Sequence, residues 1–204
     1  MKMQRHMILS LMQCVGIIIG VLSFFPFSAH ASAVLLSDKR SEIHIGQQLQ
    51  ILEDVDRKWG FAELEQLPDD VWTNSSSTIP TFGFTKSRYW VRFTVQSEDR
   101  EVLQRILELE YSHYDKVNIF LVSNGEVQSF AMGDLEPFQT RLVDYRNFLL
   151  PFSLEAGGSI DFFVSFETSG PLFFPINIWN PIDFAAQKTT ADHVAGYYYG
   201  IFWR

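Results

Sequence analysis

The sequence predicts an all-β protein built as a sandwich of two sheets. From Tyr89 onwards, apolar and polar residues alternate with a period of two, which is typical of strands with one buried face. The alternating segments are short and recur at intervals of about 10–20 residues, separated by turn residues such as Asn124-Gly125. Few stretches have a helical period. These three observations together favour a β-sandwich.

The predicted strands are numerous and short. They cover residues 89–96, 107–111, 117–121, 127–130, 148–152, 160–167 and 172–179. Ser123-Asn124-Gly125-Glu126 predicts a tight turn between the third and fourth of them. Pro175 cannot donate a backbone hydrogen bond, so we expect an edge or a bulge in the last strand.

The segment before the alternating strands has a mixed pattern. Residues 46–52 fit either a strand or a helical turn, and residues 61–66 predict a short helix. This helix should end before Pro68, because the residue that precedes a proline avoids helical geometry. Residues 74–78 are Asn, Ser and Thr, which predict a polar loop.

The N-terminus has the pattern of a secretory signal peptide. Lys2 and Arg5 precede an apolar run over residues 7–25, and Ala29-His30-Ala31 supplies the small residues that signal peptidase accepts. We therefore predict a signal peptide over residues 1–31, cleaved after Ala31. The alternative is an uncleaved anchor helix, since the apolar run approaches the length that spans a bilayer.

Charge and cysteine content narrow the possible partners and the compartment. Residues 1–31 contain two cations and no acid, so their removal changes the net charge from −8 to −10. Such a charge argues against nucleic acid and anionic lipid as main partners. The single cysteine, Cys14, lies in the signal segment. Export without disulfides is ordinary for a bacterial periplasmic protein.

The C-terminal pattern changes from strand to helix after Pro181. Residues 194–203 are apolar and rich in aromatic side chains, which is typical of a helix entering a membrane. We predict that residues 32–190 form the sandwich and that residues 191–204 begin a truncated first transmembrane helix. The expected architecture is therefore a sandwich with an N-terminal signal helix and a short apolar C-terminal helix.

Several segments, in this order, resemble one family. They are Phe82-Gly83-Phe84-Thr85-Lys86-Ser87-Arg88-Tyr89-Trp90-Val91-Arg92-Phe93, Leu107-Glu108-Leu109-Glu110-Tyr111, Asp115-Lys116-Val117, Gly133-Asp134-Leu135, Arg146-Asn147-Phe148 and Pro175-Ile176-Asn177-Ile178-Trp179-Asn180-Pro181. The set is similar to the type-2 extracellular domain of bacterial seven-transmembrane receptors with diverse intracellular signalling modules (7TMR-DISM). The resemblance covers about residues 40–203.

The resemblance implies a jelly-roll sandwich like that of carbohydrate-binding modules and a role as a periplasmic input domain. It implies a location at the periplasmic face of the bacterial inner membrane. Contact with the membrane would be made through C-terminal helices that this chain lacks. The family offers no universal ligand residues to transfer to this sequence.

The sequence gives no support for an enzyme. No Gly-x-Ser-x-Gly motif is present, and His44, His113 and His193 are isolated from one another in sequence. Glu108 and Glu110 fall on one face of a strand, and paired carboxylates can hydrolyse glycosides. We favour instead a structural pairing of these carboxylates with Arg92 on a neighbouring strand. No cofactor and no metal site are predicted.

Five residues are candidates for binding a ligand. Trp90 and Arg92 fall on the outward face of their strand, where the indole could stack a sugar ring and the guanidinium could donate hydrogen bonds. Asp134, Arg141 and Arg146 lie in or beside a long connection that could form a rim of the sandwich. The alternatives are structural: Trp90 is covered by another segment, and Asp134 caps a turn or pairs with an arginine.

Two functions follow from these patterns. The first is a ligand-sensing input domain of a transmembrane receptor, with a carbohydrate-like or small polar ligand. The alternative is a module that forms a homodimer or pairs with another receptor's periplasmic domain, without a small ligand. Outward aromatic residues, Trp90, Phe120 and Phe163, motivate the alternative, because exposed apolar clusters mark interfaces.

Overall fold

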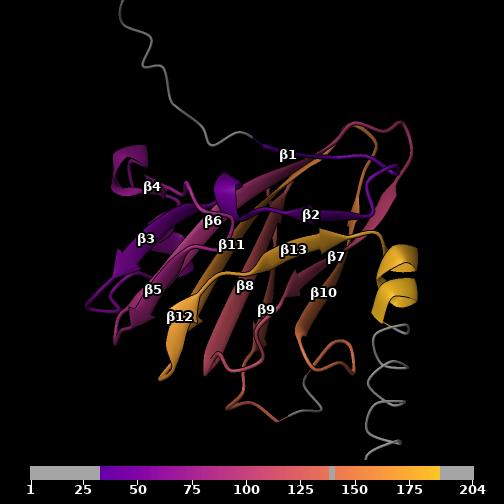
Figure 1. The fold of residues 1–204 in the computed structure, drawn as a ribbon. Coiled ribbons are helices and arrows are strands. Elements are labelled where there is room, and N and C mark those ends of the chain that lie inside the picture. Colours follow the sequence, from indigo (N-terminus) through magenta and orange to yellow (C-terminus); the bar gives the residue numbers. More distant parts are fainter. Residues whose placement is uncertain (1–32, 138–140, 189–204) are drawn as a thin grey trace, which may run out of the picture. The chain divides into compact units, whose positions relative to one another are not determined.

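The computed structural model describes residues 33–137 and 141–188, which form two mainly antiparallel sheets and an additional hairpin (Figure 1). The predicted signal peptide, residues 1–31, and the predicted start of a transmembrane helix, residues 191–204, lie outside the described residues. Among the residues that are described, no helix is both long enough and apolar enough to cross a membrane.

The larger sheet is built around two long central strands. Its order is β4 (Thr73–Asn74), β3 (Gln50–Asp54), β6 (Arg88–Ser97), β11 (Ser159–Glu167), β8 (Lys116–Ser123) and β9 (Glu126–Met132). β11 pairs with residues 89–96 of β6 along one edge. The other edge is shared by β3, which pairs antiparallel with residues 88–92, and β1 (Val34–Leu36), which pairs parallel with residues 95–97.

The smaller sheet has four strands in the order β10 (Phe148–Leu154), β7 (Leu103–Leu109), β13 (Ile176–Trp179) and β2 (Glu42–His44). A separate hairpin joins β5 (Thr81–Phe84) to β12 (Pro171–Phe173). The single last strand predicted over residues 172–179 is therefore wrong. The chain leaves one sheet at Phe174 and enters another at Ile176, because Pro175 has no N–H with which to continue a ladder.

Within residues 33–137 and 141–188, helical structure is confined to short segments. These are η1 (Gly46–Gln48), α2 (Phe61–Leu64), η2 (Asp69–Val71) and a helix over residues 181–188. The ambiguous segment 46–52 thus contains both alternatives, a helical turn followed by β3. The helix over 181–188 begins at Asn180, whose side-chain oxygen accepts from the backbone N–H of Ile182 at 2.9 Å. Pro181 suits the first helical turn because its missing N–H would have no helical partner.

The main core lies between the two sheets and confirms the predicted sandwich. The alternate residues Tyr89, Val91, Phe93 and Val95 of β6 are buried there, together with the inward residues of both sheets. The ring of Phe93 stacks on Phe162 of β11 with the centroids 4.9 Å apart. The turn between β8 and β9 is also as predicted, since Asn124 and Gly125 have φ angles of 51° and 80°.

The outer face of the larger sheet is covered by residues 55–72, which we call the aromatic cover. Trp90 is only 3% exposed and packs with Leu52, Leu64 and Trp72. Phe61 of α2 stacks on Phe120 at a centroid distance of 4.5 Å. The outward aromatics of β6, β8 and β11 therefore do not form an exposed face. Alternation predicted which way they point, and the covering segment lies far from them in the sequence.

The outer face of the smaller sheet is covered by the helix over residues 181–188, which we call the helical cover. Its Phe184 packs edge-on against Trp179 of β13, with the ring centroids 5.7 Å apart. Leu149 and Trp179 are buried in the same cluster. This helix is the yellow element beside β7 and β10 in Figure 1. Both sheets thus bury side chains on each of their faces.

Candidate ligand-binding cleft

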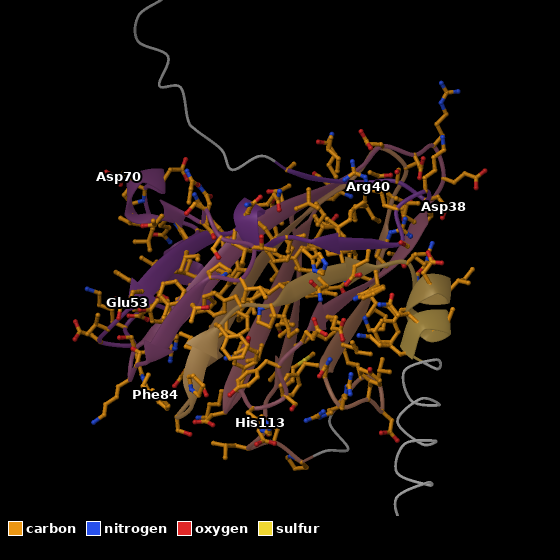
Figure 2. The ribbon with its side chains drawn as sticks, viewed as in Figure 1. Asp38, Arg40, Glu53, Asp70, Phe84 and His113 are labelled. Carbon is orange, nitrogen blue, oxygen red and sulfur yellow. The ribbon has the colours of Figure 1, made fainter. Side chains whose placement is uncertain are left out.

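A cleft of about 570 Å³ opens at one end of the larger sheet. Its lining comes from the loop after β3, the end of β5 and the segment that follows it, the start of β8 and the residue before it, the loop after β9, and the end of β11 with the two residues after it. The lining residues are Arg57, Phe84, Thr85, Lys86, Asp115, Lys116, Leu135, Glu167, Thr168 and Ser169. Figure 2 shows Phe84 and His113 toward this end, away from Asp38 and Arg40.

Glu167 fixes one side of the cleft through two arginines. Its carboxylate accepts from Arg57 Nη1 at 3.0 Å and from Arg88 Nε at 3.0 Å. Arg57 also donates from Nη2 to the carbonyl oxygen of Lys86 at 2.8 Å. Arg57 has a φ angle of 53°, a left-handed conformation that is uncommon for a residue with a side chain. The surrounding bonds hold this conformation in place and tie the loop after β3 to the segment that carries Lys86.

Asp115 fixes the other side. Its carboxylate accepts from the backbone N–H of Ser169 at 2.7 Å and from the Ser169 hydroxyl at 3.3 Å. Gly133 lies so close that an added Cβ would overlap the carbonyl oxygen of Asp115. Only glycine allows this approach, which lets the backbone N–H of Leu135 donate to the same carbonyl at 3.4 Å. Leu135 is thereby held at the rim.

Tyr114 anchors the same wall from the core. It is fully buried, and its hydroxyl donates to the carbonyl oxygen of Phe173 at 2.6 Å. Burial raises the pKa of the Tyr114 hydroxyl well above its usual value. The residue therefore stays neutral and serves to position its neighbours, His113 and Asp115, at the surface.

The open parts of the cleft are cationic and apolar. Lys86 and Lys116 are exposed, and within residues 33–137 and 141–188 neither side chain has an ion pair. Phe84 is 82% exposed and Leu135 is 69% exposed. An exposed ring beside flexible ammonium groups and hydroxyls can stack on a ligand ring and donate hydrogen bonds to its oxygens.

A second depression, of about 540 Å³, has the opposite charge. It is lined by Asp38 in the loop after β1 and, at the β6–β7 turn, by Glu98, Asp99, Arg100, Glu101, Val102 and Leu103. Asp99 Oδ2 accepts from the backbone N–H of Asp38 at 2.6 Å. In the part of the chain that the structure describes, no group of three or more His, Cys, Asp and Glu residues could hold a metal ion.

Two of the predicted ligand residues belong to β6 and lie beneath the aromatic cover. Trp90 is buried there, so its ring offers no surface on which a sugar could stack. Arg92 donates to Gln50 Oε1 at 2.8 Å and to Asp69 Oδ1 at 2.6 Å, and its guanidinium lies 4.5 Å from the ring centroid of Trp72. Both residues therefore contact other residues of the domain and help to hold the aromatic cover on the sheet.

The other three predicted residues are divided between two places. Asp134 is exposed, lies 3.8 Å from His113 Nδ1 and is the chain neighbour of Leu135 at the cleft. Arg141 donates to the carbonyl oxygens of Tyr145 and Arg146, both at 2.8 Å, and closes its own loop. Arg146 is exposed, with its guanidinium 5.8 Å from the Tyr145 ring. The structure therefore does not bring the five together, and ligand binding by them stays a prediction.

The predicted pairing of Arg92 with Glu108 and Glu110 is wrong. Arg92 lies in the larger sheet and Glu108 in the smaller one. Glu108 is fully buried beneath the helical cover, where it accepts from the indole N–H of Trp179 and the amide of Asn147, both at 2.7 Å. Lys188 Nζ lies 3.4 Å from Glu108 and 4.0 Å from Glu110. A period of two shows which residues of a strand share a face, but it does not show which sheet the strand joins. For this reason Arg92 was wrongly assigned as the partner of Glu108 and Glu110.

The cleft residues were not among the candidates from sequence. A signal for them was nevertheless present, because three of the segments that resemble the receptor family meet there, the third being Gly133-Asp134-Leu135, which contributes Leu135. The first contains Phe84, Thr85 and Lys86, and the second contains Asp115 and Lys116. Their proximity in space was not readable from their order in the chain.

Comparisons with known proteins identify relatives of this chain at two levels. The sequence model of the family described as 7TMR-DISM extracellular 2 matches residues 46–180, which include every residue of the cleft. No curated protein matches the sequence. Among solved structures, TmCBM61 in complex with beta-1,4-galactotriose matches with 12% identity and a TM-score of 0.35, covering 69% of this chain and 99% of that one.

Proposed function

Because this chain belongs to the 7TMR-DISM extracellular 2 family, we propose that it is the periplasmic ligand-sensing input domain of a bacterial transmembrane signalling receptor. We further propose that its ligand, a carbohydrate-like or small polar molecule, occupies the cleft between Phe84, Lys116 and Ser169. In this proposal residues 1–31 direct export to the periplasmic face of the inner membrane, and residues 191–204 begin the first membrane helix.

The exposed ring of Phe84 is the observation that carries the ligand proposal. A phenylalanine that is 82% exposed leaves most of its apolar surface in water, which is unfavourable unless a partner covers it. Thr85 and Ser169, which carry hydroxyl groups, line the same cleft. A flat ring flanked by hydrogen-bonding groups matches the two faces of a sugar, one apolar and the other rich in hydroxyls. The volume of about 570 Å³ is that of a small-ligand site.

The cleft supports binding without catalysis. Its only carboxylate–hydroxyl contact is that of Asp115 with Ser169 within the described residues, and the same carboxylate is held by the Ser169 backbone N–H. A serine nucleophile needs a base that is oriented by a third group. The nearby His113 instead lies close to Asp134, at 3.8 Å. We propose that the domain is not an enzyme.

A thermal-shift screen tests the ligand proposal. The whole chain is purified and melted with a panel of neutral sugars, sugar acids and small polar metabolites. We expect at least one compound to raise the melting temperature, and Phe84→Ala to abolish that rise. Leu142→Ala is the matched control, because Leu142 is 51% exposed and does not line the cleft. A panel without any stabilising compound, or a shift that survives Phe84→Ala, would contradict the proposal.

The alternative is a dimerisation module without a small ligand. The argument for it from outward aromatic residues no longer applies. Trp90 is buried against the aromatic cover, and Phe120 and Phe163 pack against the same segment and are partly buried by it. Self-association stays a prediction. Sedimentation of the whole chain tests it directly, and a monomer across the concentration range would exclude a stable homodimer of this chain.

A further inference from the structure

We propose that the ligand is a sugar acid, whose carboxylate lies between Lys86 and Lys116 while its ring lies on Phe84. This inference rests on the proposed function and adds the charge of the ligand. It depends on how the charges within the cleft are paired, on how the two lysines are placed and on the charge of the rest of the domain.

The acids of the cleft are already satisfied by the protein. Glu167 is held by two guanidinium groups at 3.0 Å each. Asp115 accepts both from the backbone and from the hydroxyl of Ser169. A cationic ligand would have to compete with these bonds. Neither carboxylate is therefore a ready partner for an incoming positive charge.

The two lysines are in the opposite situation. Within the described ranges no acid pairs with Lys86 or Lys116. Lys116 begins β8, directly opposite Glu167 in the β8–β11 ladder. The Lys86 backbone is held by Arg57, the same side chain that holds Glu167. The backbones of both cations are thus fixed around one point, and their ammonium groups remain available to an anion.

A cationic cleft stands out in an acidic protein. The full chain has a net charge of −8, and two of its cations, Lys2 and Arg5, lie in residues 1–31. Residues 32–204 therefore have a net charge of −10. The other depression is lined by four carboxylates and one arginine. A local excess of positive charge in such a background attracts anions to one place on the surface. The contrast between the two depressions gives the cleft its selectivity for a negative group.

The neighbouring apolar surface distinguishes a sugar acid from a bare anion. Phosphate or sulfate would use the lysines and leave Phe84 and Leu135 in water. A pyranose with a carboxylate uses both, since the ring covers Phe84 and the carboxylate accepts charge-assisted hydrogen bonds. Lysine, a compact point charge on a flexible stem, adapts to a carboxylate without imposing a bidentate geometry.

Calorimetric titration of the whole chain tests the inference. Glucuronate, galacturonate and mannuronate are each compared with their neutral parent sugar and with inorganic phosphate. At least one sugar acid should bind more tightly than its parent and more tightly than phosphate. Lys86→Gln and Lys116→Gln should each weaken it roughly tenfold, as expected for the loss of one charge-assisted hydrogen bond. Raising the salt concentration should weaken the wild-type binding as well.

The control is Lys39→Gln, which removes the same charge from an exposed residue that does not line the cleft. Its chain neighbours Asp38 and Arg40 lie away from Phe84 in Figure 2. This variant should leave the affinity unchanged. If neutral parents bind as well as the acids and depend on Phe84, the inference is overturned and the proposed function stands. If phosphate binds as tightly as the sugar acids, the sugar part is overturned. If neither acids, neutral sugars nor other small polar compounds bind, both proposals fail.

Discussion

The outer face of the larger sheet lies under residues 55–72, and that of the smaller sheet lies under the helix over residues 181–188. The two covers bury indole rings in different ways. The indole nitrogens of Trp72 in the aromatic cover and of Trp90 beneath it are buried without a hydrogen-bond partner among the described residues. Beneath the helical cover, the indole N–H of Trp179 donates to the buried carboxylate of Glu108.

This difference separates two ways of holding a segment on a sheet. The aromatic cover gains from apolar area, and it tolerates small shifts because ring packing is not strongly directional. The helical cover brings the largely covered ammonium group of Lys188 to the buried carboxylate of Glu108, where the carboxylate is favourable only while a positive partner is present. It therefore fixes the register of the helix more strictly, and it should be more sensitive to the loss of one side chain.

The largest effect should follow the loss of the cation in the helical cover. Lys188→Met keeps the aliphatic stem and leaves Glu108 buried without a positive partner. We expect the free energy of unfolding to fall by about 3 kcal/mol, as measured by urea denaturation. The matched control is Lys58→Met in the aromatic cover, where the exposed Lys58 lies 4.7 Å from the Trp59 ring centroid. Its effect should be within about 0.5 kcal/mol.

The same comparison has an internal rescue. Glu108→Gln added to Lys188→Met should recover much of the lost stability, because no buried charge is then left unpaired. A double variant as unstable as the sum of the single variants would show that the two residues act independently.

The next largest loss of stability should come from replacing the tryptophan beneath each cover by phenylalanine. Trp179→Phe removes a donor from the buried Glu108 carboxylate and should cost about 2 kcal/mol. Trp90→Phe removes an indole N–H that has no partner among the described residues. It should cost about 1 kcal/mol, from lost packing alone. Equal losses in thermal or chemical denaturation would show that the Glu108 contact adds nothing to the helical cover.

A smaller effect is expected at Arg92, the polar boundary of the aromatic cover. Its bond to Asp69 joins one side chain that is 18% exposed to one that is 47% exposed, so solvent weakens the ion pair. Arg92→Ala should cost about 1 kcal/mol. Part of this should be the contact with Trp72, and Arg92→Met should therefore retain some of the stability. Identical losses for the two variants would assign the whole effect to the charge.

The smallest effect concerns pH and lies beside the helical cover. Burial raises the pKa of the Glu42 carboxyl above its ordinary value of 4.5, although His44 and Lys188 oppose the shift. The folded protein therefore favours protonated Glu42, and this contribution is present below pH 4.5 and lost as pH rises through the folded pKa. Glu42→Gln should flatten this part of the stability–pH profile. A variant with an unchanged slope between about pH 4 and 6 would contradict the assignment.

The sequence predicted the strands better than it predicted what covers them. Alternation identified β6, β8 and β11, because burial of one face of a strand leaves a local period of two. It could not show that residues 55–72 fold over Trp90, since that contact joins segments distant in sequence. The same limit applies to Glu108, whose partners Asn147, Trp179 and Lys188 come from three later segments.

The cleft escaped prediction for a related reason. Phe84 ends β5 and Lys86 follows it, whereas Lys116 begins β8, and neither place has a motif whose chemistry is local. The outward Trp90 and Arg92 attracted attention because an aromatic beside a guanidinium is a recognisable local pattern. In the structure Trp90 and Arg92 pack against the aromatic cover. The exposed aromatic ring is that of Phe84, six residues earlier in the chain.

The order of the elements around the corner at Phe174 and Pro175 determines how the last part of the domain would respond to a pulling force. The chain runs without interruption from Ser169 at the cleft through β12 and β13 to the helix that carries Lys188. β13 is hydrogen-bonded to β7 along one edge and to β2 along the other. Tension applied along this strand from the helix would load both ladders in shear at once, whereas an edge strand such as β9 can be peeled away one bond at a time.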